Sequence, residues 1–186
     1  MIGYAFTGSF CTLKKSIATL AELVGLGYDV VPIVSENVYS RDTRFYSATD
    51  FIKEVEEISG KRVIHTIEAA EPLGPKMPLE YLIIAPCTGN TLAKIANGIT
   101  DTAVTMAAKA HLRCDRPLLI ALASNDAMSQ NLGNVSRLLT RKSVFFTPML
   151  QDDPSGKPHS LVADFSKIKD AFEKMKSGVQ IRPLFI

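Results

Sequence analysis

An apolar run that ends at a proline and then passes into a helix constrains the fold of this chain more than any other segment. Residues 82–85 read Leu-Ile-Ile-Ala and predict a short buried strand, whose pairing Pro86 is expected to stop because it has no backbone N–H. Thr88, Gly89 and Asn90 then present a hydroxyl, bare backbone and a carboxamide where the next helix begins. Since the first N–H groups of a helix favour a phosphate or a carboxylate, this turn predicts a ligand-binding crevice. An ordinary helix start capped by Thr88 or Asn90 is the alternative interpretation.

Short apolar runs alternate with helical patterns along the whole chain. Strands are predicted over 2–6, 29–34, 62–66, 81–85, 118–123 and 144–146. Helices are predicted over 13–23, 49–58 and 161–176. Three more are expected, of which one ends at 98, one runs from 101 or 102 to 112, and one begins with 124–126 and reaches 139. Polar or irregular loops are predicted over 35–43, 70–78 and 151–158. The alternation predicts a single α/β domain over residues 1–186, a Rossmann-like three-layer sandwich with a mostly parallel sheet.

The composition is that of a globular domain with a sizeable core, since 46% of the 186 residues are hydrophobic and 22% are charged. The net charge of +2 and the scattered Lys and Arg residues argue against a nucleic-acid partner. No apolar run approaches the length of a membrane span, and the chain opens on a predicted strand instead of a signal peptide. We therefore expect a cytoplasmic protein without a membrane partner. Cys11, Cys87 and Cys114 form no C-x-x-C pair, so neither a disulfide framework nor a metal site is expected.

Four polar loops of similar design each follow a predicted strand. They cover residues 7–9, 35–37, 86–90 and 124–126, and they are rich in hydroxyl, amide and glycine residues. Because the carboxyl ends of parallel strands lie at one edge of a sheet, these loops are expected to meet there. Hydroxyl and amide groups that converge with helix N-termini predict a mononucleotide or phosphate pocket, although each loop alone could simply cap a helix.

Other motifs and residue types narrow the chemistry only by exclusion. The chain has no G-x-G-x-x-G after its first strand and no Walker sequence, which disfavours an ATPase and an NAD enzyme that acts alone. The three histidines have no informative spacing, and Cys87 is expected to be a small apolar filler. Asp152 and Asp153 are expected to form a solvated turn, unless their loop closes over the pocket, where they could hold a metal or act as a base. No catalytic residue is assigned.

The order of the polar loops resembles that of the FMN-binding flavoprotein superfamily, which includes the phosphopantothenoylcysteine and peptidyl-cysteine decarboxylases and the flavin prenyltransferases. The matching segments are 7–9, 85–91 and 94–101. Nearly the entire chain also resembles one family within it, the B subunits of dipicolinate synthases from spore-forming bacteria, on segments 71–76, 88–90, 106–110, 125–127 and 151–154. The resemblance implies a flavodoxin-like fold, bound FMN, and a homo-oligomer, a trimer or a multiple of it, with the pocket at an interface between its copies. The residues that would bind FMN are Thr7, Gly8, Ser9, Ser35, Asn37, Thr88, Ser124 and Asn125.

The chain departs from the superfamily where the known chemistry of other members resides. The catalytic His of the cysteine decarboxylases falls at about Pro72, and residues 151–153 replace their Cys-containing lid. The Lys-Glu pair of the flavin prenyltransferases becomes Arg113-Cys114. Decarboxylation is therefore disfavoured, and prenyl transfer is a distant alternative.

The same resemblance implies a function shared with a partner. The A subunit of a dipicolinate synthase carries NAD(P), and the two polypeptides oxidise dihydrodipicolinate to pyridine-2,6-dicarboxylate in the mother cell during sporulation. Asn90, Lys94, Arg41 and Arg44 are expected to bind this small dicarboxylate, and residues 147–160 are expected to form an active-site loop. Two hypotheses stay open: a flavoprotein that takes part in the redox chemistry, and a non-catalytic protein that binds substrate or stabilises its partner in an old flavin fold.

Overall fold

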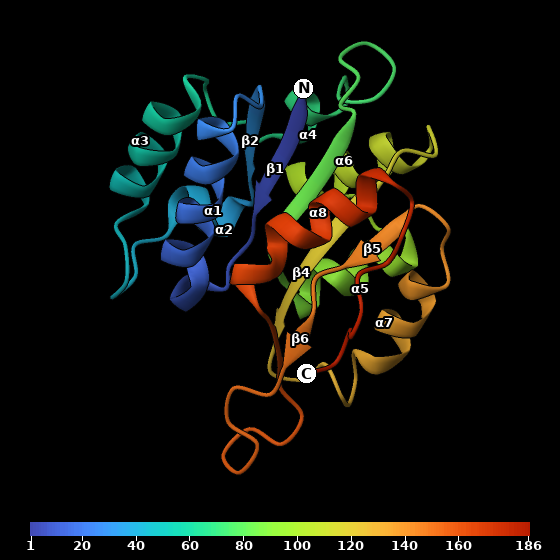
Figure 1. The fold of residues 1–186 in the computed structure, drawn as a ribbon. Coiled ribbons are helices and arrows are strands. Elements are labelled where there is room, and N and C mark those ends of the chain that lie inside the picture. Colours follow the sequence, from blue (N-terminus) through green and yellow to red (C-terminus); the bar gives the residue numbers. More distant parts are fainter.

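A seven-stranded, mostly parallel sheet forms the middle layer of the molecule (Figure 1). The computed structural model describes residues 1–186. Its strands are β1 (Ile2–Phe6), β2 (Val30–Val34), β3 (Tyr81–Thr88), β4 (Leu118–Ser124), β5 (Val144–Phe146), β6 (Met149–Leu150) and β7 (Leu161–Ala163). They lie in the order β2-β1-β3-β4-β7-β6, and β5 pairs with the first part of β4. Strands β1 to β5 pair in parallel, whereas β7 runs antiparallel to both β4 and β6.

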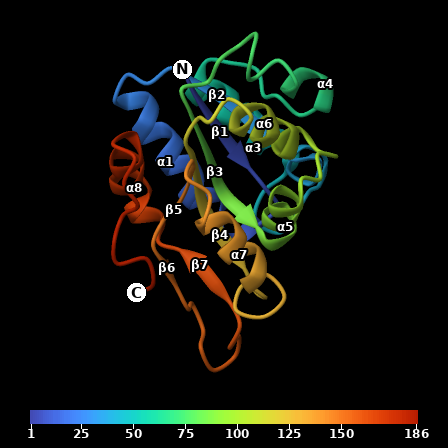
Figure 2. The ribbon, with the colours of Figure 1, turned by 90° about the vertical axis from the view of Figure 1, so that its right-hand side faces the viewer.

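Helices cover both faces of the sheet (Figure 2). They are α1 (Leu13–Gly25), α2 (Glu36–Ser40), α3 (Ala48–Ser59), α4 (Ile67–Ala70), α5 (Gly89–Asn97), α6 (Ala103–Leu112), α7 (Leu132–Leu139) and α8 (Ile168–Lys176), with 3₁₀ turns η1 (Phe10–Thr12) and η2 (Phe165–Lys167). Helices α1, α3 and α8 contribute to the cluster on one face, and α4, α5, α6 and α7 to the cluster on the other. None of these helices combines the length and apolar character that a membrane crossing requires.

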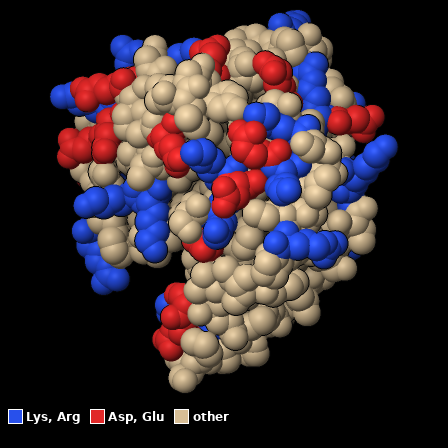
Figure 3. Space-filling model, viewed as in Figure 1, with Lys and Arg blue, Asp and Glu red and all other residues tan.

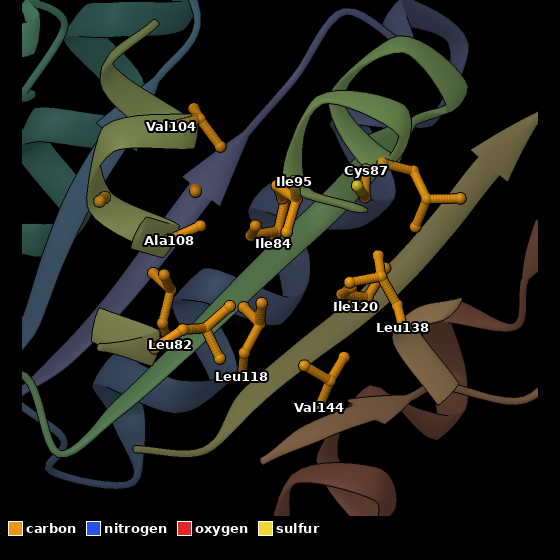
Figure 4. Close-up of a cluster of buried hydrophobic side chains, with 14 of the residues drawn as sticks. Leu82, Ile84, Cys87, Ile95, Val104, Ala108, Leu118, Ile120, Leu138 and Val144 are labelled. Carbon is orange, nitrogen blue, oxygen red and sulfur yellow. The ribbon is translucent and has the colours of Figure 1, made fainter. Parts of the chain in front are cut away.

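The sheet separates two hydrophobic clusters of similar size, one of 26 and one of 24 buried residues. Successive side chains of a strand point to opposite faces, so Leu82 belongs to one cluster and Ile83 to the other. Figure 4 shows Leu82 beside Leu118 of β4, both facing the helix that carries Ala108. Because both faces are covered, every residue of β4 is buried, which explains its continuous apolar sequence up to Ser124.

The predicted three-layer α/β fold is confirmed, and most elements lie within a few residues of their expected bounds. Five local predictions are wrong, four of which concern the following segments and one the end of β3. The strand expected over 62–66 is only an isolated bridge between Ile33 and Ile64 at the sheet edge, and the expected loop 35–43 contains α2. Residues 125–131 form turns, so the helix expected from that point starts at Leu132. The segment 161–176 begins as β7, because antiparallel pairing with β4 overrides its local helical pattern, and α8 starts at Ile168.

Strand β3 continues through Pro86, contrary to the prediction that it ends there. Its pairing with β4 shifts register between Ile84 and Cys87 and then resumes, so that Thr88 lies opposite Ala123. The missing N–H of proline interrupts the ladder at one point only. The strand therefore carries Thr88 to the edge of the sheet, where Thr88 becomes the residue before α5.

Candidate functional site

A cleft of about 820 Å³ opens at the carboxyl-terminal edge of the sheet. The loops after β1, β3 and β4 line it with Gly8 and Ser9, with residues 88–90 and with residues 123–126. The loop between β6 and β7 contributes further lining residues from 152–160. Figure 1 shows this loop projecting beyond the sheet, and Figure 3 shows the surface hollowed between it and the body of the molecule. Three polar loops thus meet in one pocket, as their positions after parallel strands predict.

Thr7 fastens the first loop to the second. The buried Thr7 hydroxyl donates to the carbonyl of Pro86 at 2.8 Å and accepts from the N–H of Thr88 at 2.9 Å. Thr7 does not itself line the cleft. It is a positioning residue that sets the end of β1 against the end of β3.

The 3₁₀ turn η1 that follows β1 has free backbone donors, and one of their residues, Cys11, lines the cleft. The hydroxyl of Thr12 donates to the carbonyl of Ser9 at 2.8 Å and to its hydroxyl at 3.1 Å, which shapes this turn. The N–H groups of Phe10 and Cys11 have no acceptor in the chain. Donors of this kind at the start of a helix bind phosphate or carboxylate oxygens.

Gly89 lies where two loops approach too closely for a side chain. Thr88 caps α5 by accepting the N–H of Thr91 at 3.3 Å, which decides between the two predicted caps. A Cβ atom at Gly89 would lie 2.7 Å from Asn131 Nδ2 and 2.8 Å from Asp126 Oδ1. Such distances are below any van der Waals contact, so the packing of these loops requires glycine here.

A hydrogen-bond network rigidifies the loop after β4. Asn131 Nδ2 donates to both carboxylate oxygens of Asp126 at 2.9 Å, and the Ser124 hydroxyl donates to the same carboxylate. These hydrogen bonds, that from Ser124 first, hold the pKa of Asp126 below its usual range. Asp126 therefore stays ionised and is already saturated with donors, so its part is to shape the cleft.

The loop between β6 and β7 is held in a compact turn by its own polar groups. Asp152 accepts from Lys157 Nζ at 2.8 Å and from the Ser160 hydroxyl at 3.0 Å, and Gln151 Nε2 donates to the carbonyl of Pro158 at 3.0 Å. The bond from Lys157 is the main reason that the pKa of Asp152 is lowered. Asp152, Lys157 and Ser160 all line the cleft, so this loop contributes to its wall instead of standing apart in solvent.

A model of the flavoprotein family matches residues 1–174, a span that includes every loop of the cleft. The chain belongs to the flavoprotein family. This flavoprotein is 42% identical to the dipicolinate synthase B subunit of Bacillus subtilis over 185 residues, which cover 100% of the chain and 92% of that protein. Its structure resembles the crystal structure of the dipicolinate synthase B subunit from Bacillus halodurans with a TM-score of 0.91 and 38% identity, over 100% of this chain and 95% of that one. The FMN-dependent cysteine decarboxylase SpaF shares the fold at 21% identity and a TM-score of 0.69, over 94% of this chain and 96% of that one.

Of the residues predicted to bind FMN, several line the cleft and the others do not. Gly8, Ser9, Thr88, Ser124 and Asn125 line the cleft. The remaining three, which are Thr7, Ser35 and Asn37, do not. The Ser35 hydroxyl at the end of β2 is buried and has no hydrogen-bond partner, and Asn37 lies beside Gly8.

The predicted substrate residues are mostly elsewhere. Only Asn90 lines the cleft. Lys94 forms an ion pair with Asp101 at 2.8 Å, Arg41 is exposed, and Arg44 lies over the ring of Phe45 at 4.8 Å. None of these three side chains lines the cleft of this chain.

The cleft contains two cations that the sequence analysis did not single out. Lys15 of α1 lines it without an ion-pair partner, and Lys157 lines it while paired with Asp152. The exposed Cys11 lies on the same wall, 4.0 Å from the Ser9 hydroxyl. The sequence did offer a signal for Lys15 and Cys11, because both lie in the first turns after loop 7–9 and these turns start beside whatever that loop binds.

No histidine lines the cleft. His65 stacks on Tyr39 with 3.7 Å between ring centroids, and burial lowers the pKa of His111 to about 4. Cys87 is buried in the core, and burial raises the pKa of its thiol, which confirms its prediction as an apolar filler. No group of three His, Cys, Asp or Glu side chains could hold a metal ion.

Proposed function

We propose that this flavoprotein binds FMN in the cleft and acts as the B subunit of a dipicolinate synthase, which oxidises dihydrodipicolinate to pyridine-2,6-dicarboxylate. The observation that carries the proposal is one cleft of about 820 Å³ built from three strand-end loops, in a chain 42% identical over its whole length to the B subunit of a dipicolinate synthase. Partnership with an A subunit that carries NAD(P), a homo-oligomer, and a location in the mother cell of a spore-forming bacterium belong to the same proposal.

The donor set of the cleft suits a flavin mononucleotide. Its volume lies within the range of about 300–1,000 Å³ that is usual for small-molecule sites. The free N–H groups of Phe10 and Cys11 fit an anionic phosphate, and the hydroxyls of Ser9, Thr88 and Ser124 fit polar atoms of the ribityl chain and ring. When bound, FMN supplies a two-electron acceptor, and the protein supplies binding and orientation.

The unpaired hydroxyl of Ser35 is a further argument for a ligand near the first two loops. A buried hydroxyl without a partner costs roughly 1–3 kcal/mol, so native proteins rarely retain one without a reason. Ser35 lies directly after β2, whose last residue pairs with Phe6 just before the first loop. We infer that it completes the phosphate site when the cofactor is bound.

Lys15 and Asn90 are the groups that would hold the substrate. An ammonium and a carboxamide at the mouth of the cleft match a carboxylate-bearing ring, and Lys15 has no internal partner to displace. The loop 147–160 would act as the active-site loop, since Lys157 and Asp152 reach the cleft from it.

A non-catalytic binding or scaffolding role is the second candidate. The cleft holds no histidine, and both of its carboxylates, Asp126 and Asp152, are kept ionised by their hydrogen bonds. A site without a poised acid or base favours binding over chemistry. Flavin-dependent decarboxylation and prenyl transfer are less favoured. Decarboxylation is disfavoured because the position of the decarboxylases' catalytic His falls at about Pro72 in this chain.

The decisive experiment is a titration of the cofactor-free chain with FMN, followed by quenching of flavin fluorescence. Saturable binding at micromolar concentrations or tighter is expected, together with its loss in Ser9→Tyr, which fills the cleft. Ser136→Tyr on the exposed side of α7 is the matched control and keeps full affinity. Absence of binding in the unmodified chain would refute the flavin part, and catalysis would then be sought in the partner.

A further inference from the structure

A second cavity, of about 180 Å³, lies between the end of α5, helix α6 and the turn after α7. It shares no lining residue with the cleft in which we propose that FMN binds, called the flavin cleft from here on. Its charged lining residues are Lys109, Arg113 and Arg141, and we call this cavity the basic pocket. Lys109 lies in the last turn of α6 and Arg113 directly after it, whereas Arg141 arrives from the end of α7.

The three cations of the basic pocket have no counter-charge. None of the nine lining residues is acidic, and no side chain of Lys109, Arg113 or Arg141 takes part in an ion pair or hydrogen bond within the chain. On the face in Figure 3 the two signs are interspersed, and the hollow beside α3 contains pairs such as Arg62 with Glu56 at 3.0 Å.

Like charges that gather in one small cavity repel one another and attract an anion from solution. The neighbouring surface strengthens this field, because Lys142 and Arg182 line an adjoining hollow that also includes Arg141. An anion that fits the cavity would neutralise several cations at once. Guanidinium groups favour carboxylate or phosphate oxygens, which they bind through two parallel N–H donors.

The remaining walls of the basic pocket restrict the shape of that anion. The buried Ile95 and Leu112 and the half-exposed Ile99 give the basic pocket an apolar part. The volume of about 180 Å³ is below the range of roughly 300–1,000 Å³ of ordinary ligand pockets, which favours a ligand smaller than a nucleotide. Apolar lining together with three cations suits a small organic anion that carries more than one acidic group.

We propose that the basic pocket is a binding site for a small organic dicarboxylate, separate from the flavin cleft. Helix α5 connects the two sites, since its first residues line the cleft and its last residues line the basic pocket. A ligand in the basic pocket therefore contacts the helix on which the cleft is built. Only the choice of pyridine-2,6-dicarboxylate as the probe rests on the proposed function; the site itself does not.

Isothermal titration calorimetry of the full chain with pyridine-2,6-dicarboxylate, in buffer free of divalent cations, tests the proposal. Arg113→Gln and Arg141→Gln are each expected to weaken binding about tenfold or more, because each removes a charged donor pair. The matched control is Lys14→Gln, an exposed lysine of α1 outside the basic pocket and the adjoining hollow, which leaves affinity within about twofold. All three positions are exposed, so the thermal unfolding of the variants is expected to match that of the parent.

Lys15→Gln separates the two sites. If the dicarboxylate binds only in the flavin cleft, Lys15→Gln weakens it while Arg113→Gln and Arg141→Gln do not, and the basic pocket is overturned while the proposed function stands. If pyridine-2-carboxylate or inorganic phosphate binds as tightly, with the same dependence on both arginines, selection for a dicarboxylate is refuted. Absence of any saturable binding also refutes it. FMN affinity, measured separately, is expected to be equal in all basic-pocket variants, so failure of the flavin proposal is recognised independently.

Discussion

The buried hydroxyl of Thr7 provides the sharpest test of how the cleft is built. Thr7→Val keeps the shape of the side chain and removes both the donor to Pro86 and the acceptor of the Thr88 N–H, at 2.8 and 2.9 Å. The Thr88 N–H then loses this acceptor, whereas the Pro86 carbonyl keeps the backbone N–H of Thr7 at 3.2 Å, and a polar group left unpaired costs roughly 1–3 kcal/mol. We expect a loss of about 1–3 kcal/mol in the free energy of unfolding, or about 2–12 °C in Tm for a domain of this size.

Urea unfolding followed by circular dichroism measures the stability, and FMN titration measures the site. Because Thr7 positions Thr88 without lining the cleft, the affinity for FMN is expected to fall together with stability, even at temperatures where the variant is fully folded. Thr49→Val, on the exposed face of α3, is the matched control and is expected to change stability by less than about 0.5 kcal/mol. If Thr7→Val also costs less than about 0.5 kcal/mol, the two hydrogen bonds do not join the loops and the reasoning fails.

Three further predictions concern other parts of the molecule. Gly89→Ala forces a Cβ atom against Asp126 and Asn131, so it is expected to destabilise the fold by about 1–3 kcal/mol and weaken FMN binding, and equal affinity and Tm would contradict the close packing. Lys15→Gln is expected to weaken dicarboxylate binding in the cleft about tenfold while Lys14→Gln, outside the cleft, does not, which calorimetry can measure. Burial lowers the pKa of His111 from 6.5 to about 4, so the unfolded chain binds more protons between these values. Stability therefore falls by about 3 kcal/mol as the pH drops from about 6.5 to about 4, and His111→Gln should remove that part of the slope in urea midpoints.

The cleft loops were predictable because each depends on a short local pattern. A buried strand followed by hydroxyl, amide or glycine residues recurs at 7–9, 88–90 and 124–126, and the parallel sheet then brings these loops to one edge. The fourth predicted loop, 35–37, does not line the cleft. The same local reasoning failed where tertiary pairing decides. Residues 161–163 have a helical pattern, yet the exposed edge of β4 binds them as an antiparallel strand.

The charged residues of the site were harder to predict, because a long side chain reaches whichever partner the fold provides. Lys94 lies on α5, whose first turn lines the cleft, but its ammonium group forms an ion pair with Asp101, seven residues further along the chain. Lys157 lies in a loop of polar residues and becomes part of the cleft only because β6 and β7 extend the sheet beyond β4. Asp126 and Asn131 form one network only because the residues between them form turns instead of the helix that their sequence suggested.

The electrostatics of the cleft also constrain how the proposed reaction is shared between this chain and its partner. Conversion of a dihydropyridine to a pyridine removes a hydride and a proton, so it needs both an acceptor of electrons and a base. Asp126 and Asp152 are weak bases, because hydrogen bonds from Ser124 and from Lys157 hold their pKa values down. With no histidine in the cleft, the proposed sites for the cofactor and the carboxylates include no strong base. We therefore expect the isolated chain to bind FMN and dicarboxylate without turnover, and the partner protein to restore turnover when it is added.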